Sequence, residues 1–350
     1  MGNLGFSISS KAIELGYEKC GIIKVETVAD YQERVNERIS RIPFGEVKYK
    51  MVAGYAYPGE KYPWAKSIIV LVVPYSTFNV PKDFDGMYAK SHLFDNRVNV
   101  KAEANIARKD FGTFLNELGI KFVTEEKYGL TGVRWAAYKA GLGIIRRNNF
   151  FYTENGSYCS IEAFLIDKEI ELVGVPNLHD CPDDCNRCIK ACPTGSLFEP
   201  YTMDPAKCVS YHTTRPITPP SNVPTIETAR LFGSSLYGCD ICQDICQFNK
   251  DKMIGGKDFV GLNELLEFMH PEKIMEMSYA EIGSTIGEKF WYLHNDDAVW
   301  KWKIDALTYM MNQFIPNYEA AIKSGSTDSN NDVRMYAENV CKELGISINI

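Results

Sequence analysis

Cys181-Pro-Asp-Asp-Cys185-Asn-Arg-Cys188-Ile-Lys-Ala-Cys192-Pro193 opens the stretch that decides the fold, and Cys239-Asp-Ile-Cys242-Gln-Asp-Ile-Cys246 closes it. Cys208 lies alone between the two runs. Eight of the 11 cysteines of the chain therefore fall in one segment. Thiols grouped in this way indicate a metal-binding or disulfide framework rather than scattered core residues.

The spacing of the cysteines indicates which metal they bind. In two-cluster ferredoxins, three cysteines of a C-x2-C-x2-C-x3-C-Pro run hold one iron–sulfur cluster and the fourth reaches the other cluster. The first run fits this rule, except that Cys181 lies one residue further out, and Cys208 completes the second run. We therefore predict two 4Fe–4S clusters with crossed ligands. The first cysteine set is Cys181, Cys185, Cys188 and Cys246; the second cysteine set is Cys192, Cys208, Cys239 and Cys242.

Two other readings of the cysteines stay open at this point. All-cysteine zinc sites also use four thiolates, but they usually pair two C-x2-C knuckles, whereas the x3-Cys-Pro ending is typical of ferredoxins. A disulfide framework is typical of secreted chains, and Met1-Gly-Asn-Leu-Gly-Phe-Ser7 lacks the basic start and apolar run of a secretory signal. These features predict a cytoplasmic protein.

Length and composition are those of a globular protein of one large domain or two. The chain has 350 residues, of which 45% are hydrophobic and 24% charged. No apolar run approaches the ~18 residues that a membrane span needs, so no membrane partner is expected. A net charge of -7 excludes an overall basic field for nucleic acid, although it says nothing of a single face.

Alternating strand and helix patterns over residues 1–175 predict an α/β layer structure. The continuous β-branched run at 67–73 is typical of a strand covered on both faces. We expect a loop over 75–93, a double-cluster ferredoxin-like domain over 176–255, and a helical region over 256–350 that packs on the body. The expected helices are 8–15, 29–41, 98–118, 133–139, 300–314 and 332–344; the expected strands are 20–25, 66–73, 120–124 and 158–166.

Several stretches resemble the epoxyqueuosine reductase family. Ala136-Ala-Tyr-Lys-Ala-Gly-Leu-Gly-Ile-Ile-Arg-Arg-Asn148 looks like its Ala-x-x-Ala-Gly-Leu-Gly-x-Ile-Gly-Lys-Asn signature. Ser67-Ile-Ile-Val-Leu-Val-Val-Pro-Tyr75 resembles its first-domain strand, and the two cysteine runs resemble its cluster regions. The helices at 300–314 and 332–344 are similar to its HEAT-like C-terminal pair. The resemblance covers nearly the whole chain.

The resemblance implies a reductase with two 4Fe–4S clusters and a cobalamin bound by residues 1–175. Electrons would come from a low-potential donor of flavodoxin or ferredoxin type and pass through the clusters to cobalt, and the epoxide oxygen of epoxyqueuosine in tRNA would be removed. In the signature, Gly141 and Gly143 are expected to let the corrin approach the backbone, with Arg146 and Asn148 as further cofactor ligands. Arg146 and Arg147 could grip a phosphate, or form a solvated basic turn.

Three departures from the family's pattern predict a divergent paralogue. The segment where the family has its proton-donating aspartate reads Phe122-Val-Thr-Glu-Glu-Lys-Tyr-Gly129, so Tyr128 and Glu125 become the candidate donors, with a solvated turn as the alternative. A Gly-Lys pair has become Arg146-Arg147, and a Pro-Trp pair has become Gln247-Phe248. The alternative functions are reduction of a non-tRNA substrate (an organohalide or a corrinoid protein) and cobalamin-free electron transfer.

Overall fold

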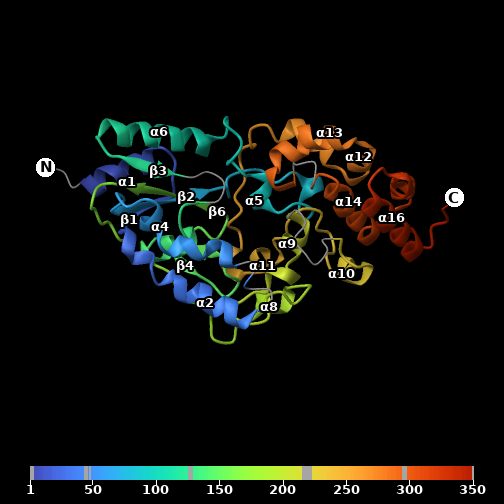
Figure 1. Ribbon diagram of the computed structural model, residues 1–350, viewed down its shortest axis with the longest axis horizontal. Helices are drawn as coiled ribbons and strands as arrows, with labels where there is room; N and C mark the ends of the chain where they lie inside the picture. The colour runs from blue at the N-terminus through green and yellow to red at the C-terminus, as the bar shows by residue number, and fades with distance from the viewer. Residues whose placement is uncertain are drawn as a thin grey trace.

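A sheet flanked by helices lies beside a helical half, and the cysteine segment lies below the point where they meet (Figure 1). This computed structural model describes residues 4–42, 46, 49–124, 129–214, 223–293 and 298–348, and at 50, 51, 53 and 292 it describes the backbone alone. No helix in these ranges is long and apolar enough to cross a membrane.

A four-stranded sheet forms the centre of the N-terminal half, in the order β1-β2-β6-β3. All three pairings are antiparallel; Leu71 of β2, for example, lies opposite Cys20 on one side and Glu162 on the other. The predicted α/β layers are therefore present around an antiparallel sheet. The strands are β1 (Lys19–Lys24), β2 (Ser67–Pro74), β3 (Phe122–Thr124) and β6 (Cys159–Ile166).

The strand β2 is buried on both faces, as its apolar run predicts. Side chains alternate along a strand, so its even-numbered residues 68–72 pack against α7 (Val133–Lys139) and its odd-numbered residues 69–73 against α1 (Leu4–Glu14) and α6 (Glu103–Glu117). Figure 1 shows α6 covering the upper face of the sheet. The helix predicted over 98–118 begins only at Glu103, because residues 96–102 form turns.

The remaining elements are short in the cysteine segment and longer at the C-terminus. The segment 75–93, predicted as a loop, contains a 3-10 helix at Lys82–Phe84 and the short helix α5 (Lys90–Leu93), and it contributes buried aromatic rings to the core. Further N-terminal elements are α2 (Tyr31–Arg41), α4 (Pro58–Lys61), β4 (Ile144–Ile145) and β5 (Phe151–Tyr152). The cysteine segment has α8 (Arg187–Ala191), α9 (Val209–Thr214), α10 (Ile226–Arg230) and α11 (Ile241–Asp244). The C-terminal helices are α12 (Pro271–Glu276), α13 (Tyr279–Ile282), α14 (Lys301–Asn312), α15 (Glu319–Ser324) and α16 (Asn331–Leu344).

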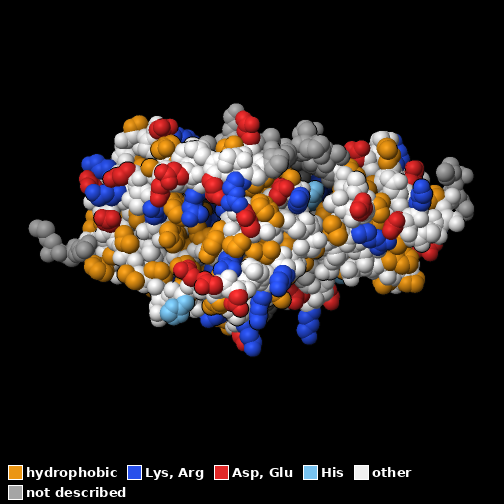
Figure 2. Space-filling model, turned by 90° about the horizontal axis from the view of Figure 1, so that it is seen from below, with side chains coloured by type: hydrophobic (Ala, Val, Ile, Leu, Met, Phe, Trp, Pro, Cys, Tyr) orange, Lys and Arg blue, Asp and Glu red, His pale blue; other side chains and the backbone are white. Residues whose placement is uncertain are grey.

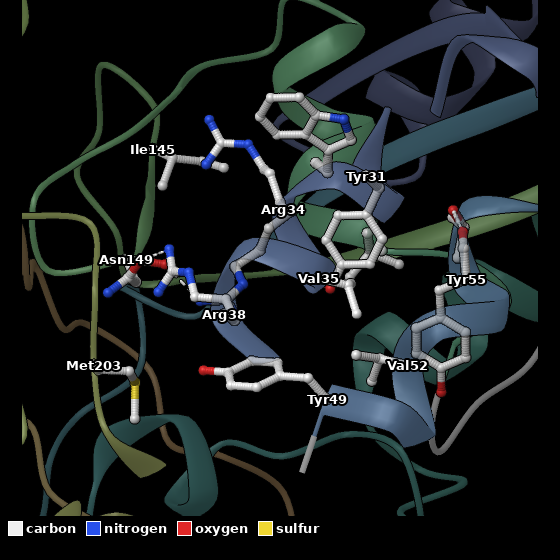
Figure 3. Close-up of a pocket in the computed structure, with 15 residues that line it drawn as sticks. Tyr31, Arg34, Val35, Arg38, Tyr49, Val52, Tyr55, Ile145, Asn149 and Met203 are labelled. Carbon is white, nitrogen blue, oxygen red and sulfur yellow. Dashed lines mark hydrogen bonds between the residues drawn. The ribbon is translucent and has the colours of Figure 1, made fainter. Parts of the chain in front are cut away.

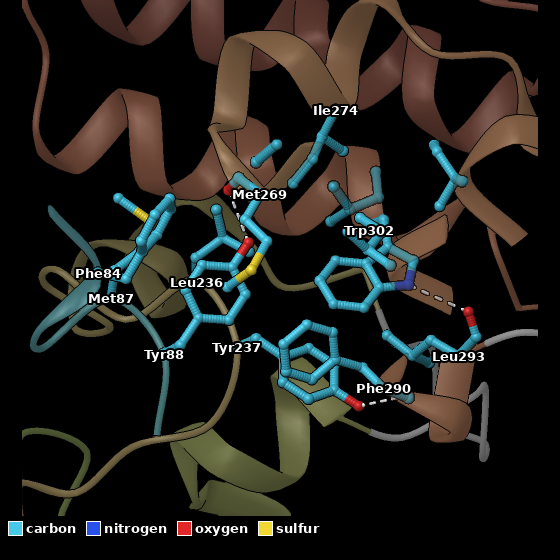
Figure 4. Close-up of a cluster of buried hydrophobic side chains, with 14 of the residues drawn as sticks. Phe84, Met87, Tyr88, Leu236, Tyr237, Met269, Ile274, Phe290, Leu293 and Trp302 are labelled. Carbon is cyan, nitrogen blue, oxygen red and sulfur yellow. Dashed lines mark hydrogen bonds between the residues drawn. The ribbon is translucent and has the colours of Figure 1, made fainter. Parts of the chain in front are cut away.

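The largest hydrophobic cluster joins the C-terminal helices to the rest of the chain (Figure 4). Trp302 of α14 stacks on Tyr237 with ring centroids 4.6 Å apart and 7° between the planes. Trp302 donates a hydrogen bond to the carbonyl of Leu293, and Tyr237 donates one to the carbonyl of Phe290. The C-terminal region thus shares a core with the segment before the last cysteine run, as expected of a helix pair packed on the body.

Candidate metal centre

The four cysteines of the first set line one small pocket. Cys188 lies on α8, which packs against α11. This contact brings Cys246, just beyond α11, across to Cys181 and Cys185. A residue of the second run therefore lies among the cysteines of the first run, the crossing that the spacing predicts.

The four cysteines of the second set also approach one another. Cys208 interacts electrostatically with Cys192, and both Cys239 and Cys242 interact with Cys208. Burial raises the pKa of Cys208 to about 11 and that of Cys239 to about 12, so these thiols keep their protons until a metal displaces them. Cys242 also interacts with Cys188, which makes the two sets neighbours.

Four thiolates are the donor set of a 4Fe–4S cluster and also of an all-cysteine zinc site. In the part of the chain that the structure describes, no three His, Cys, Asp or Glu side chains are grouped to hold one metal ion. The x3-Cys-Pro ending of the first run and the approach of Cys246 to the cysteines of that run are the features that favour clusters over zinc.

Arg146 forms the wall of the first cysteine pocket. Its side chain is 2% exposed, and its Nη1 lies 3.8 Å from the sulfur of Cys181. The guanidinium carbon lies 3.4 Å from the centre of the Phe248 ring and 5.1 Å from that of Tyr152. This residue therefore points to a cysteine and two rings, and lies in neither of the predicted settings, a phosphate grip or a solvated turn.

Arg147 and Asn148 hold the backbone of the cysteine runs in place. Arg147 donates from Nη1 to the carbonyl oxygen of Cys185 at 2.8 Å. Asn148 donates from Nδ2 to the carbonyl oxygen of Cys242 and to the hydroxyl of Tyr152, both at 2.9 Å. Each of these side chains thus ties the β4 region to a different cysteine run.

Gly141 and Gly143 are required by close packing of protein backbone. A Cβ at Gly141, whose φ is +66°, would lie 1.9 Å from the carbonyl oxygen of Gly174, and a Cβ at Gly143 would lie 2.1 Å from that of Tyr152. The close approach that these glycines permit is therefore made by the chain itself. The other predicted site residues, Tyr128 and Glu125, lie outside the described residues.

A cavity of about 270 Å³ beside α2 and α7 was not predicted (Figure 3). Three arginines line it, Arg34, Arg38 and Arg134, and none of its described lining residues is Asp or Glu. Burial lowers the pKa of Arg38 and the charges of Arg34 and Arg134 add to this, while Tyr49 and Glu37, whose Oε2 lies 3.7 Å from Nε of Arg38, oppose it. The cavity is also lined by aromatic rings: Tyr31, Tyr49, Tyr55 and Trp135. The only signal in the sequence was the spacing of Arg34 and Arg38, one turn apart on a predicted helix.

Residues 145–149 separate this cavity from the first cysteine pocket. Ile145 and Asn149 line the cavity, whereas Arg146 and Asn148 line the cysteine pocket. Arg147 lines the cysteine pocket too, so the middle of this stretch lies against the cysteines and its two ends lie against the cavity. One layer of backbone therefore lies between the cysteines of the first set and an arginine-rich cavity.

Comparisons with known proteins agree with this geometry. Residues 181–249 match the 4Fe-4S double cluster binding domain. The epoxyqueuosine reductase of Cellulophaga algicola is 28% identical over 69% of this chain and 78% of its own length, and that of Leadbetterella byssophila is 26% identical over 86% and 94%.

Solved structures extend the likeness to the fold. An epoxyqueuosine reductase with an epoxyqueuosine-modified tRNA stem loop superposes with a TM-score of 0.70 at 20% identity, over 98% of this chain and 99% of that one. The epoxyqueuosine reductase of Streptococcus thermophilus superposes with a TM-score of 0.71 at 19% identity, over 97% and 99%. This chain thus carries a 4Fe–4S double cluster binding domain and resembles epoxyqueuosine reductases in sequence over most of its length and in fold over nearly all of it.

Proposed function

We propose that this protein is a cytoplasmic iron–sulfur reductase that removes the epoxide oxygen of epoxyqueuosine in tRNA. One observation carries the proposal: the stretch 145–149 has the first cysteine set on one side and an arginine-lined cavity on the other. An electron source and a site for an anionic substrate therefore lie one backbone layer apart. The eight cysteines are the proposed ligands, in the crossed sets given above.

Loss of the epoxide oxygen as water consumes two electrons and two protons. When bound, the two clusters supply electrons one at a time, and clusters of this kind span potentials of about −700 to +450 mV. A low-potential carrier of flavodoxin or ferredoxin type would reduce them. Tyr128 and Glu125 remain the proposed proton donors, because they precede by a few residues Thr131, which lines the cavity.

The cavity suits a nucleic acid on chemical grounds. Arginine side chains bind phosphates, although Arg38 also pairs with Glu37 at 3.7 Å, and unstacked RNA bases stack on aromatic rings such as Tyr31 and Trp135. The face seen from below carries Lys and Arg side chains interspersed with Asp, Glu and hydrophobic ones (Figure 2). The arginines of the cavity are therefore the basic group that this chain, of net charge -7, offers to phosphates here.

Cobalamin is the second cofactor that the resemblance implies, and when bound it would supply cobalt as the centre that reduces the substrate. The residues predicted to bind it do not fit this role. Backbone fills the space beside Gly141 and Gly143, Arg146 faces Cys181, and Asn148 bonds to Tyr152. A cobalamin-binding α/β domain is therefore proposed from the resemblance alone. The same holds for α14 and α16 as a HEAT-like pair. We also propose the domain limits 1–175, 176–255 and 256–350.

The test is anaerobic reconstitution with iron and sulfide, followed by assay on tRNA that contains epoxyqueuosine, with and without cobalamin. We expect queuosine to form only with protein that carries both clusters, and a changed corrin spectrum on uptake of cobalamin. The double variant Arg34→Ala/Arg38→Ala should weaken tRNA binding and flatten its salt dependence, whereas Lys109→Ala on the exposed side of α6 should not. No conversion by fully loaded protein, with tRNA binding insensitive to salt, would contradict the proposal.

A further inference from the structure

Arg146 is a buried cation without a carboxylate partner among the described residues. It is 2% exposed, and its Nε has no hydrogen-bond partner in that part of the chain. Its Nη1 donates to the sulfur of Cys181 at 3.8 Å. A full charge in such a place is costly unless an anion compensates it.

The compensating anion must come from the cysteine pocket. Thiolates, and not thiols, bind metal, so the first set becomes negative when it is loaded, and a cluster gains one further negative charge on reduction. We infer that the cluster held by the first cysteine set is the counter-charge of Arg146, and that Arg146 raises the reduction potential of this cluster. The inference rests on the cluster assignment of the proposed function.

The aromatic rings next to Arg146 explain why an arginine suits this position. A planar guanidinium stacks on ring faces and keeps its fork free at the edge, which a lysine ammonium cannot do. The ring of Phe248 at 3.4 Å and that of Tyr152 at 5.1 Å hold the group beside Cys181. The guanidinium is thereby fixed against the cysteine pocket.

Two departures from the resembled motifs meet in this contact. Arg146 occupies the place of a signature glycine, and Phe248 occupies the place of a tryptophan after the last cysteine. The two residues lie far apart in the sequence, yet the structure puts one side chain on the other. The fold thus brings together two positions at which this chain departs from the resembled motifs.

The second cysteine set lies next to a negatively charged side chain instead of a positively charged one. Asp240 lies between Cys239 and Cys242 in the sequence and interacts electrostatically with both. Lys90 faces Asp240, with Nζ 3.7 Å from Oδ2, and offsets part of its charge. The cluster of the first set should therefore have the higher reduction potential of the two, because net charge is one of the factors that set the potential of a cluster.

The experiment is an anaerobic redox titration of the cluster-loaded protein without tRNA, followed by electron paramagnetic resonance. At the potential where half of the first cluster is reduced in the wild type, we expect the reduced fraction to fall about tenfold in Arg146→Met and Arg146→Gln, as for loss of one nearby unit charge at an effective dielectric constant of about 20. The second cluster is the internal control and should not move. Arg146→Lys should restore part of the shift, and Arg187→Met, an exposed arginine of the same pocket, should change the fraction less than about twofold.

The outcomes separate this inference from the proposed function. The inference would be overturned if Arg146→Met assembled both clusters and its first cluster titrated as in the wild type. If that variant fails to assemble, the same result for Arg146→Gln would overturn it. A wild type without iron would overturn both proposals. A shifted first cluster in protein that leaves tRNA unconverted would support the inference and contradict only the proposed substrate.

Discussion

Buried positive charge is balanced in different ways in two regions of the molecule, the C-terminal helices and the first cysteine pocket. In α14, Lys301 is 1% exposed and pairs with Asp305 one turn later at 2.9 Å, and Lys303 pairs with Asp328 at 2.9 Å. At the first cysteine pocket, Arg146 is buried to a similar degree without a carboxylate among the described residues. The C-terminal helices thus balance their charge within the chain, whereas the cysteine pocket needs an anion that no described side chain supplies.

This contrast separates two sources of stability. The C-terminal region gains its stability from a shared aromatic core and paired charges, so it should keep its structure in metal-free protein. The cysteine segment has short helices and buried thiols that must lose protons to bind metal, so its stability should depend on the clusters.

Exchange of single cysteines should remove whole clusters in a crossed pattern. Cys246→Ser should lower iron from about eight to about four per chain and leave the second set loaded, although Cys246 belongs to the second run. Cys192→Ser should lower iron equally but leave the first set loaded. Iron analysis with paramagnetic resonance measures this, and Cys20→Ser, outside the segment, is the control. Loss of the same cluster in both variants would contradict the crossed sets.

Removal of one partner from the buried C-terminal pair should be costly. Lys301→Met leaves Asp305 buried without its cation, and we expect a loss of about 3–5 kcal/mol in the free energy of unfolding. Urea unfolding at about pH 8 measures it. Lys323→Met on α15 is the matched control, because Lys323 pairs with Glu319 over the same spacing at 40% and 46% exposure, where a pair contributes less than about 1 kcal/mol. Equal losses of unfolding free energy in both variants would show that the buried pair contributes no more than the exposed one.

Local patterns in the sequence predicted the helices well. The helix expected at 133–139 is found with the same bounds, and the one expected at 332–344 begins one residue earlier. In the second case the cause is local: the side chain of Asn330 accepts from the backbone amides of Asp332 and Val333, and Gly345 ends the helix at φ +69°. At 98–102, by contrast, Asn99 accepts from the amide of Lys101 and a turn replaces the expected helix.

Contacts between distant segments could not be predicted in this way. The crossing of Cys246 followed from a spacing rule, but the stacking of Arg146 on Phe248 depends on how the β4 region meets the end of the cysteine segment. The same limit applies to Gly141: its sequence setting shows that something approaches closely, and only the fold shows that the carbonyl of Gly174 does so. The antiparallel strand order is likewise a property of the whole sheet.

The buried pair on α14 should also make stability depend on pH. Burial raises the pKa of Asp305 to about 7, although Lys301 opposes this, whereas an unfolded chain has a value of about 3.9. Because the folded state binds this proton more tightly, the contribution of Asp305 is full below about pH 4 and is lost as the pH rises through about 7. The stability of the wild type relative to Asp305→Asn should therefore fall by a few kcal/mol from about pH 5 to 7 and level off above. Urea unfolding across this range measures it; a rise over the same range would contradict the assignment.

The smallest effect is expected at Arg146, and it most directly separates the cysteine pocket from the C-terminal helices. In metal-free protein, prepared with a chelator under reducing conditions, the thiols regain their protons and Arg146 loses its counter-charge. Arg146→Met should then unfold at higher urea than the wild type, by about 1 kcal/mol, because a methionine fills the space over Phe248 without a buried charge. With the clusters loaded, Arg146→Met should instead unfold at lower urea than the wild type. Arg147→Met is the matched control: it loses the bond to the carbonyl of Cys185 and should destabilise both forms slightly. The same sign in both forms for Arg146→Met would mean that the charge of this arginine is balanced by something other than the cluster.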